Sequence, residues 1–344
     1  IRRLVQYLFM NINVISVMKS RVYFYPSASR GGYLNPYCPN YKEALARNYK
    51  VLDRDNKPTK MLSFAFLLYS FCADIYVINW LESVCFLRLS FLQYLFARLG
   101  LLVIRLRRKK IVWMFHNIHP HEGNNQYSKI LQRILFKDSS LIISHSQEAA
   151  EYARQKTCRK VVYRCHPVKA MEWRPNMHVG HCDILIWGAI LPYKGVAEFL
   201  KLLNDKGANF RVNVIGKCKN RELENKIKVE CNERISFQNI HVGFSDLAGM
   251  IYNSNYVVFP YVGDCVSSSG ALIDTIVMGG TVVGPNRGAF KDLADEGVCI
   301  TYDSNAELLR ILSEEYHLDH DKRKVFIENN SWEKFETFFE KMVD

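Results

Sequence analysis

The stretch WGAILPYKG at residues 187–195 decides the fold class of this 344-residue chain. It follows the apolar run 183–187, contains a Gly/Pro turn, and leads into an amphipathic pattern over 196–205. A buried strand followed at once by a tight turn and a helix is the repeating unit of parallel α/β sheets. Lys194 is then expected at the carboxyl edge of the sheet, beside a helix N-terminus, a place that suits a diphosphate.

The same alternation of apolar runs and helical patterns extends in both directions from this stretch. Near-continuous Val/Ile runs separated by helices predict parallel sheets that are covered on both faces. The predicted strands are 21–26, 74–80, 110–117, 141–144, 160–164, 183–187, 210–215, 256–261, 280–283 and 298–302. The predicted helices are 36–48, 82–105, 126–137, 147–156, 196–205, 222–232, 245–253, 270–278 and 306–316. The expected fold class is α/β, with two Rossmann-like doubly wound domains facing a cleft.

Periodicity is lost over 166–180, which contains two prolines and predicts a linker. The expected domains are an N-terminal domain at 18–165 and a C-terminal domain at 181–330. A final amphipathic segment, 331–344, is expected to form a helix that packs back on the N-terminal domain. Residues 1–17 are interpreted as an extension. Doubly wound domains bind ligands at the carboxyl ends of their strands, so the cleft between the two sheets is the expected site.

The charge of the chain is unevenly distributed. The chain carries 46 Lys/Arg and 34 Asp/Glu, a formal net charge of +12. Residues 1–165 hold 26 of the basic and 9 of the acidic residues, whereas 166–344 hold 20 and 25. This split indicates that the N-terminal domain meets an anionic partner.

One apolar stretch, 84–104, has the length of a membrane span but contains Arg88 and Arg98. Arginines at the centre of a bilayer are costly, so a span is not expected. The stretch precedes the basic run RLRRKK at 105–110 and predicts a helix lying on an anionic membrane surface. The alternative is a core helix of the first domain whose basic end is solvated, and the sequence leaves both open.

Several function classes are excluded by missing motifs. The ten cysteines contain no C-x-x-C pair, which argues against a zinc ribbon or thioredoxin-like site and favours a reduced, cytoplasmic setting. Neither G-x-G-x-x-G nor G-K-[ST] occurs, which argues against a nicotinamide dehydrogenase or a P-loop NTPase.

A second candidate phosphate site follows the predicted strand 256–261. The run SSSG at 267–270 offers hydroxyls and backbone N–H groups at the start of a helix. Asp274 lies one helical turn further on, where a carboxylate could accept hydrogen bonds from ribose hydroxyls.

The first half holds a polar segment, FHNIHPHE at 115–122, after a predicted strand. Three histidines and a glutamate raise the possibility of a metal site, but the spacing is not H-E-x-x-H and a proline interrupts any helix. A loop of satisfied polar residues and a set of sugar and acceptor contacts are the other interpretations. The sequence Asp53-Arg54-Asp55 mimics a D-x-D metal motif but is interpreted as an exposed turn.

Residues 188–195 and 269–279, in this order, resemble the donor domain of GT-B glycosyltransferases, specifically the retaining, family 4-like group that includes bacterial capsule and exopolysaccharide enzymes. The resemblance implies that Lys194 holds the donor diphosphate and that Asp274, in place of the usual glutamate, holds the ribose. The group often has a second glutamate at the position of Val266, which this chain lacks, and Asp264 is the candidate substitute.

The resemblance also implies roles in the N-terminal, acceptor-side domain. His116 would contact the donor sugar or phosphate, and Glu122 would orient or deprotonate an acceptor hydroxyl. The predicted catalytic residues are thus His116 and Glu122, with no metal. The predicted donor-binding residues are Gly31, Gly32, Gly188, Lys194, Tyr261, Ser268, Ser269, Gly270, Asp274 and Arg287.

The function implied is transfer of a hexose from a UDP- or GDP-sugar to a lipid-linked saccharide or polysaccharide acceptor. Transfer with retention, in surface polysaccharide biosynthesis, is expected. The expected partners are the nucleotide-sugar, the lipid-linked acceptor and an anionic membrane surface, without nucleic acid and without a cofactor. The expected location is cytoplasmic, at the inner face of the cell membrane. The alternatives are a sugar-nucleotide epimerase on the same fold and a non-catalytic basic protein that binds membranes or nucleic acid.

Overall fold

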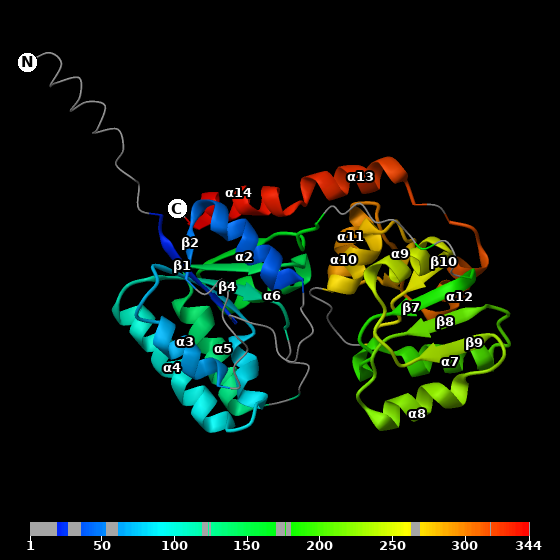
Figure 1. Cartoon of the computed structure of the whole chain (residues 1–344), viewed down its shortest axis with the longest axis horizontal. Coiled ribbons are helices and arrows are strands. Elements are labelled where there is room, and N and C mark those ends of the chain that lie inside the picture. The colour runs from blue at the N-terminus through cyan, green and yellow to red at the C-terminus, as the bar shows by residue number, and fades with distance from the viewer. Residues whose placement is uncertain are drawn as a thin grey trace, which may run out of the picture.

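Two six-stranded parallel sheets occupy the two halves of the molecule (Figure 1). The structure is a computed structural model that describes residues 19–26, 36–52, 61–118, 123, 125–169, 176, 180–262, 269–316 and 318–343. Helices cover both faces of each sheet, because the central strands are apolar on both sides. The prediction of two Rossmann-like doubly wound domains is confirmed.

The first sheet has the strand order β2-β1-β3-β4-β5-β6. Its strands are β1 (Arg21–Tyr25), β2 (Lys50–Val51), β3 (Ile75–Asn79), β4 (Lys110–Phe115), β5 (Leu141–Ser144) and β6 (Lys160–Tyr163). One face packs on the helices α3 (Leu62–Tyr69), α4 (Ser90–Leu106), α5 (Gln126–Asp138) and α6 (Gln147–Lys156). The other face packs on α2 (Tyr37–Asn48) and α14 (Trp332–Val343).

The second sheet has the order β12-β11-β10-β7-β8-β9. Its strands are β7 (Cys182–Trp187), β8 (Val212–Ile215), β9 (Ile235–Gln238), β10 (Ser254–Val258), β11 (Val282–Pro285) and β12 (Ile300–Tyr302). One face is covered by α9 (Phe244–Tyr252), α10 (Gly270–Val277), α11 (Gly288–Asp295) and α13 (His320–Asn329). The other is covered by α7 (Val196–Asp205), α8 (Arg221–Glu230) and α12 (Asn305–Ser313).

The expected single helix over 82–105 is wrong. A 3₁₀ helix, η1 (Leu81–Phe86), comes first, and α4 begins at Ser90 after Leu89, whose φ is 60°. Left-handed backbone at a leucine interrupts the regular helix, so the apolar stretch bends there. Within α4, Gly100 lets α3 approach closely, because a Cβ there would lie 2.7 Å from the ring of Phe66.

The C-terminal segment crosses from the second domain to the first. After α13 the chain continues as α14, which lies on α2 (Figure 1). Phe335 and Phe339 are fully buried there, and Arg47 of α2 pairs with Glu336 at 3.3 Å. The last helix of the sequence therefore completes the core of the first domain.

Two carboxylates bridge the domains. Asp292 of α11 accepts a hydrogen bond from the backbone N of Gln147 (2.8 Å), the first residue of α6. Glu148 of α6 in turn accepts one from the backbone N of Gly288 (2.9 Å), the first residue of α11. Each acid thus neutralises the positive end of a helix in the other domain. Burial raises the pKa of Asp292 to about 6.

Within the described part of the chain, no helix combines the length and the apolarity that crossing a membrane requires.

Candidate functional site

A cavity of about 590 Å³ lies between the two domains, at the carboxyl ends of the strands. The first domain contributes the start of α2 and the second contributes the β7–α7 turn and the start of α10. The predicted donor-binding residues that line it are Gly188, Lys194, Tyr261, Ser269, Gly270 and Asp274. The structure therefore brings six residues from three separate segments of the sequence into one cavity.

Two glycines shape the β7–α7 turn that carries Lys194. Gly188 has φ 103° and Gly195 has φ 63°, both in the region that glycine adopts without strain. A Cβ on Gly195 would lie 2.1 Å from the carbonyl oxygen of Pro260, so the turn is packed directly against the chain that follows β10. These contacts place Lys194 at the carboxyl edge of the sheet rather than in solvent.

The Lys194 side chain is buried, and the described residues supply no charge partner for it. The residue is 8% exposed, and its Nζ lies 5.2 Å from the ring centroid of Tyr261. None of the carboxylates in the described part of the chain lies within ion-pair distance of it. A buried cation without a counter-ion is costly, so this geometry favours binding of an anion.

The start of α10 presents backbone donors to the same cavity. Ser269 is the N-cap residue, and its Oγ accepts from the backbone N of Leu272 at 3.4 Å. Gly270 follows and lines the cavity, and a Cβ there would meet no atom of the described residues within 4 Å. A helix N-terminus beside a buried lysine is a suitable phosphate site.

Asp274 lies one turn into α10 and also lines the cavity. Burial raises the pKa of its carboxyl group to about 7. The neighbouring Thr275 accepts a hydrogen bond from Nε1 of Trp187 (2.8 Å), which ties α10 to the end of β7. Asp274 is therefore held in a fixed position, and its charge depends on pH near neutrality.

Arg287 lies apart from this group. It lines a smaller hollow of about 360 Å³ on the other side of Tyr261, and its Nη2 donates to the backbone oxygen of Tyr261 at 2.7 Å. In this arrangement Arg287 supports the loop that carries Tyr261. Its predicted contact with the donor diphosphate stays a prediction.

His116 is buried beside the cavity and does not line it. It is 5% exposed, stacks on Trp80 with ring centroids 4.2 Å apart, and its Nε2 donates to Oδ1 of Asn79 at 2.9 Å. Burial lowers the pKa of His116 well below its usual value, with His145 and His166 adding to the effect, so the ring is neutral. Its predicted catalytic role stays a prediction.

An aromatic and histidine cluster surrounds Tyr37 and was not predicted from the sequence. The Tyr37 hydroxyl donates to Nε2 of His145 at 3.0 Å, and Nδ1 of His145 donates to the backbone oxygen of Arg164 at 2.8 Å. Tyr37, His166 and Trp332 also line the cavity. These residues come from α2, the linker and α14, and no local spacing in the sequence signals that they meet.

Several predicted residues lie outside the described part of the chain: Gly31, Gly32, Asp53, Asp55, Glu122, Asp264, Val266 and Ser268. Their roles stay predictions. Among the residues that the structure does describe, no group of three or more His, Cys, Asp or Glu side chains could hold a metal ion.

No family model and no curated protein matches this sequence, but solved structures match over nearly the whole chain. The Anabaena protein HepE in complex with UDP-glucose is 13% identical, with a TM-score of 0.62 over 93% of this chain and 95% of that one. Sucrose-phosphate synthase from Thermosynechococcus elongatus is 12% identical, with a TM-score of 0.69 over 94% and 98%. A trehalose-6-phosphate synthase studied for glycosyl transfer with retention is 11% identical, with a TM-score of 0.63 over 94% and 98%.

At these identities the similarity shows the fold. The chain has the two-domain GT-B fold of these proteins, as the resemblance noted in the sequence predicted.

Proposed function

We propose that this protein is a glycosyltransferase that moves a hexose from a nucleotide diphosphate sugar to an acceptor with retention of configuration. The observation that carries the proposal is the buried Lys194 of the β7–α7 turn, which has no ion-pair partner among the described residues and lines the same cavity as the N-terminus of α10. Support comes from the shared fold, since one similar structure holds UDP-glucose and another similar protein was studied for transfer with retention.

Each residue of the cavity has a distinct task in this proposal. Lys194 and the backbone N–H groups at Ser269 and Gly270 stabilise the negative charge that develops on the leaving diphosphate. Asp274 accepts hydrogen bonds from the ribose hydroxyls. Gly188 supplies the positive φ of 103° that the turn before Lys194 requires.

The transfer needs no protein nucleophile. The bond between the anomeric carbon and the diphosphate oxygen breaks, and the acceptor hydroxyl oxygen bonds to the same face of that carbon. The acceptor proton passes to an oxygen of the leaving diphosphate, so charge and atoms balance. The protein contributes position and electrostatic stabilisation.

We further propose that the acceptor is a lipid-linked saccharide or polysaccharide at an anionic membrane surface, within surface polysaccharide biosynthesis. Support comes from an apolar face on α3 and α4, which we call the α3–α4 face. Its exposed large side chains are Phe64 (44%), Leu68 (56%), Phe91 (54%), Leu92 (39%), Leu99 (39%), Leu102 (47%) and Leu106 (73%). Exposed apolar side chains on two helices that pack together, with arginines close by in the sequence, are typical of membrane attachment in the plane of the interface.

The basic run behind α4 has a structural part as well. Arg105 pairs with Asp138 (3.7 Å), Lys109 pairs with Asp74 (2.9 Å), and Arg107 donates to the backbone oxygen of Ser70 (2.9 Å). These three side chains anchor the end of α4 to the first domain. Arg88, Arg98 and Arg108 are exposed, have no ion pair among the described residues, and supply charge for an anionic surface.

A screen of UDP-, GDP- and ADP-sugars by thermal shift, with and without EDTA, tests the donor assignment. Binding of a ligand to the folded state raises the melting temperature, and we expect one donor class to do so equally in both buffers. Product analysis with and without acceptor separates the two enzymes on this fold, because an epimerase changes the nucleotide-sugar without any acceptor. No shift with any nucleotide would contradict the proposal and favour a non-catalytic binding protein.

A further inference from the structure

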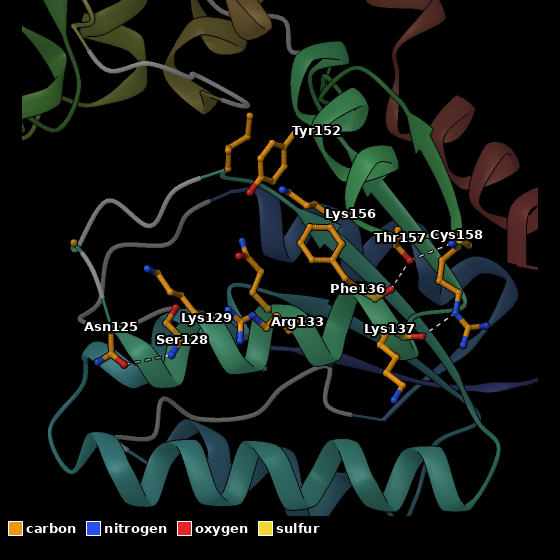
Figure 2. A pocket seen from close by; sticks show the side chains of 14 residues that line it. Asn125, Ser128, Lys129, Arg133, Phe136, Lys137, Tyr152, Lys156, Thr157 and Cys158 are labelled. Atoms are coloured by element: carbon orange, nitrogen blue, oxygen red, sulfur yellow. Dashed lines mark hydrogen bonds between the residues drawn. The ribbon is translucent and has the colours of Figure 1, made fainter.

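A second and larger hollow, of about 1220 Å³, lies in the first domain between α5 and α6 (Figure 2). It shares no lining residue with the interdomain cavity. Side chains of α5 form its floor, and the end of α6 together with residues 157–159 forms the opposite wall. We call this hollow the α5–α6 groove.

Among the described residues that line the α5–α6 groove, five are cations and none is a carboxylate. They are Lys129, Arg133, Lys137, Lys156 and Arg159, all exposed. No Asp or Glu of the described ranges forms an ion pair with any of them, although other basic side chains of the domain are paired. The described lining of the groove is therefore a concentrated positive surface.

The spacing of the cations on α5 indicates an extended ligand. Lys129, Arg133 and Lys137 are four residues apart, so they lie on one side of the helix at intervals of about 6 Å. The row spans about 12 Å, which exceeds the size of one phosphate group. Arg159 continues the row past the end of α5, where its Nε donates to the backbone oxygen of Lys137 at 2.8 Å.

Aromatic and neutral polar groups lie between the cations. Phe136 is fixed by an edge contact with Trp113 at 4.9 Å and by a hydrogen bond from Thr157 to its backbone oxygen at 2.6 Å. Tyr152 stands on the opposite wall, with Nζ of Lys156 5.1 Å from its ring centroid. The neutral polar residues that line the groove are Asn125, Ser128, Gln132 and Thr157. Rings, amides and hydroxyls are groups that recognise sugars, and the cations add recognition of negative charge.

We propose that the α5–α6 groove binds an anionic saccharide chain, with carboxylate, sulfate or phosphate groups along its length. Its use as the acceptor groove rests on the proposed function, whereas binding itself does not. A membrane fits less well, because the exposed apolar side chains gather on the α3–α4 face and not here. Single-stranded RNA also fits less well, because Tyr152 is the one part-exposed ring among the described groove residues and successive bases need successive rings.

Binding of an oligogalacturonate to the purified full chain tests the proposal. The variant Lys129→Gln/Arg133→Gln/Lys156→Gln removes three charges while keeping good helix formers. The matched control Lys206→Gln/Lys219→Gln/Arg221→Gln removes three exposed charges from the second domain. We expect the groove variant to bind about tenfold more weakly or worse, because each exposed ion pair contributes modestly. We expect the control to bind as the wild type does.

A chemical readout locates the bound chain. Cys158 lines the groove and Cys72 does not, and both are exposed free cysteines. Oligogalacturonate is expected to slow alkylation of Cys158 and to leave the alkylation rate of Cys72 unchanged. A neutral maltodextrin of equal length should protect neither.

Equal binding of oligogalacturonate by the wild type and the groove variant would overturn the proposal. So would binding of maltodextrin as tight as that of oligogalacturonate. Tighter binding of polyuridylate or anionic vesicles than of oligogalacturonate, through the same three residues, would also overturn it. If inorganic pyrophosphate displaced bound oligogalacturonate as well as free oligogalacturonate does, the proposal that the ligand is an extended chain would be overturned. UDP binding is measured on the same proteins. If only the groove proposal is wrong, UDP still binds while oligogalacturonate does not, and if only the donor-site proposal is wrong, the reverse is observed.

Discussion

At the residue scale, a lysine and a carboxyl group, Lys194 and Asp274, line the same cavity. Lys194 is a buried cation that an incoming diphosphate would neutralise. Asp274 has its pKa raised to about 7, so near neutral pH a large fraction of the unliganded protein holds this carboxyl group protonated. The carboxylate, and not the acid, accepts two hydrogen bonds from a ribose. Donor binding should therefore depend on pH.

We expect the affinity for UDP to increase as the pH rises through about 7 and then to level off. The ligand favours the deprotonated carboxyl group, so below the pKa each pH unit weakens binding by at most about tenfold. Asp274→Asn should bind UDP more weakly at pH 8 and show a flatter profile. Calorimetric titration from pH 6 to pH 8 measures both. A wild-type profile as flat as that of the variant would contradict the role of Asp274.

The raised pKa of Asp274 also makes the stability of the unliganded protein depend on pH. Between the unfolded pKa of 3.8 and the folded value of about 7, the folded state binds more protons at Asp274 than the unfolded state does. The contribution of this residue to stability therefore falls as the pH rises through that window. Loss of the carboxylate by Asp274→Asn should leave the unliganded protein at pH 8 at least as stable as the wild type.

At the scale of elements, the α3–α4 face tests the proposed membrane attachment. We expect Leu102→Glu/Leu106→Glu to reduce binding to vesicles of anionic lipid severalfold or more, because the face loses apolar contact and gains negative charge. Val229→Glu is the control, since Val229 is 81% exposed on α8 of the second domain. Cosedimentation with anionic and with neutral vesicles measures the effect. Unchanged sedimentation of the double variant would exclude the α3–α4 face as the attachment surface.

Elements with strong local patterns could be predicted from the sequence, and elements formed by tertiary contacts could not. The strand 141–144 and the helix 147–156 have the predicted bounds, because each is a short apolar or amphipathic run between polar turns. The helix α3 was missed because its sequence, LSFAFLLY, is apolar all round and shows no period. The strand β2 has two residues and exists only as an edge partner of β1.

The residues of the candidate site likewise include some that local sequence patterns predict and others that only tertiary contacts bring together. The glycines and the lysine of the β7–α7 turn, and Ser269 at the start of α10, are local features that strand-turn-helix geometry explains. The placement of Tyr37 and Trp332 against the cavity depends on α14 returning to the first domain, which joins residues about 300 positions apart. The separation of Arg287 from the cavity follows from its hydrogen bond to the Tyr261 backbone, which no sequence spacing indicates.

At the scale of the whole molecule, the two domains are joined in three ways. The first two are the linker after β6 and the segment before α14, which lie side by side. The backbone N of Val168 in the linker donates to the backbone oxygen of Asn330 at 2.8 Å. Asp292 and Glu148 form the third connection through their reciprocal contacts with α6 and α11. These links hold the interdomain cavity in an arrangement in which a ligand can contact both domains at once.

The central claim is that the interdomain cavity binds the diphosphate of a nucleotide-sugar through Lys194. Calorimetric titration of wild type, Lys194→Met and the control Lys219→Met with UDP and with the donor selected by the screen tests it most directly. Lys194→Met should lose about tenfold to a hundredfold in affinity, as expected for one charge-assisted contact. It should lose no stability without ligand, because it removes a buried charge that pairs with no carboxylate of the described residues. Equal affinity of Lys194→Met and wild type for both ligands would contradict the claim.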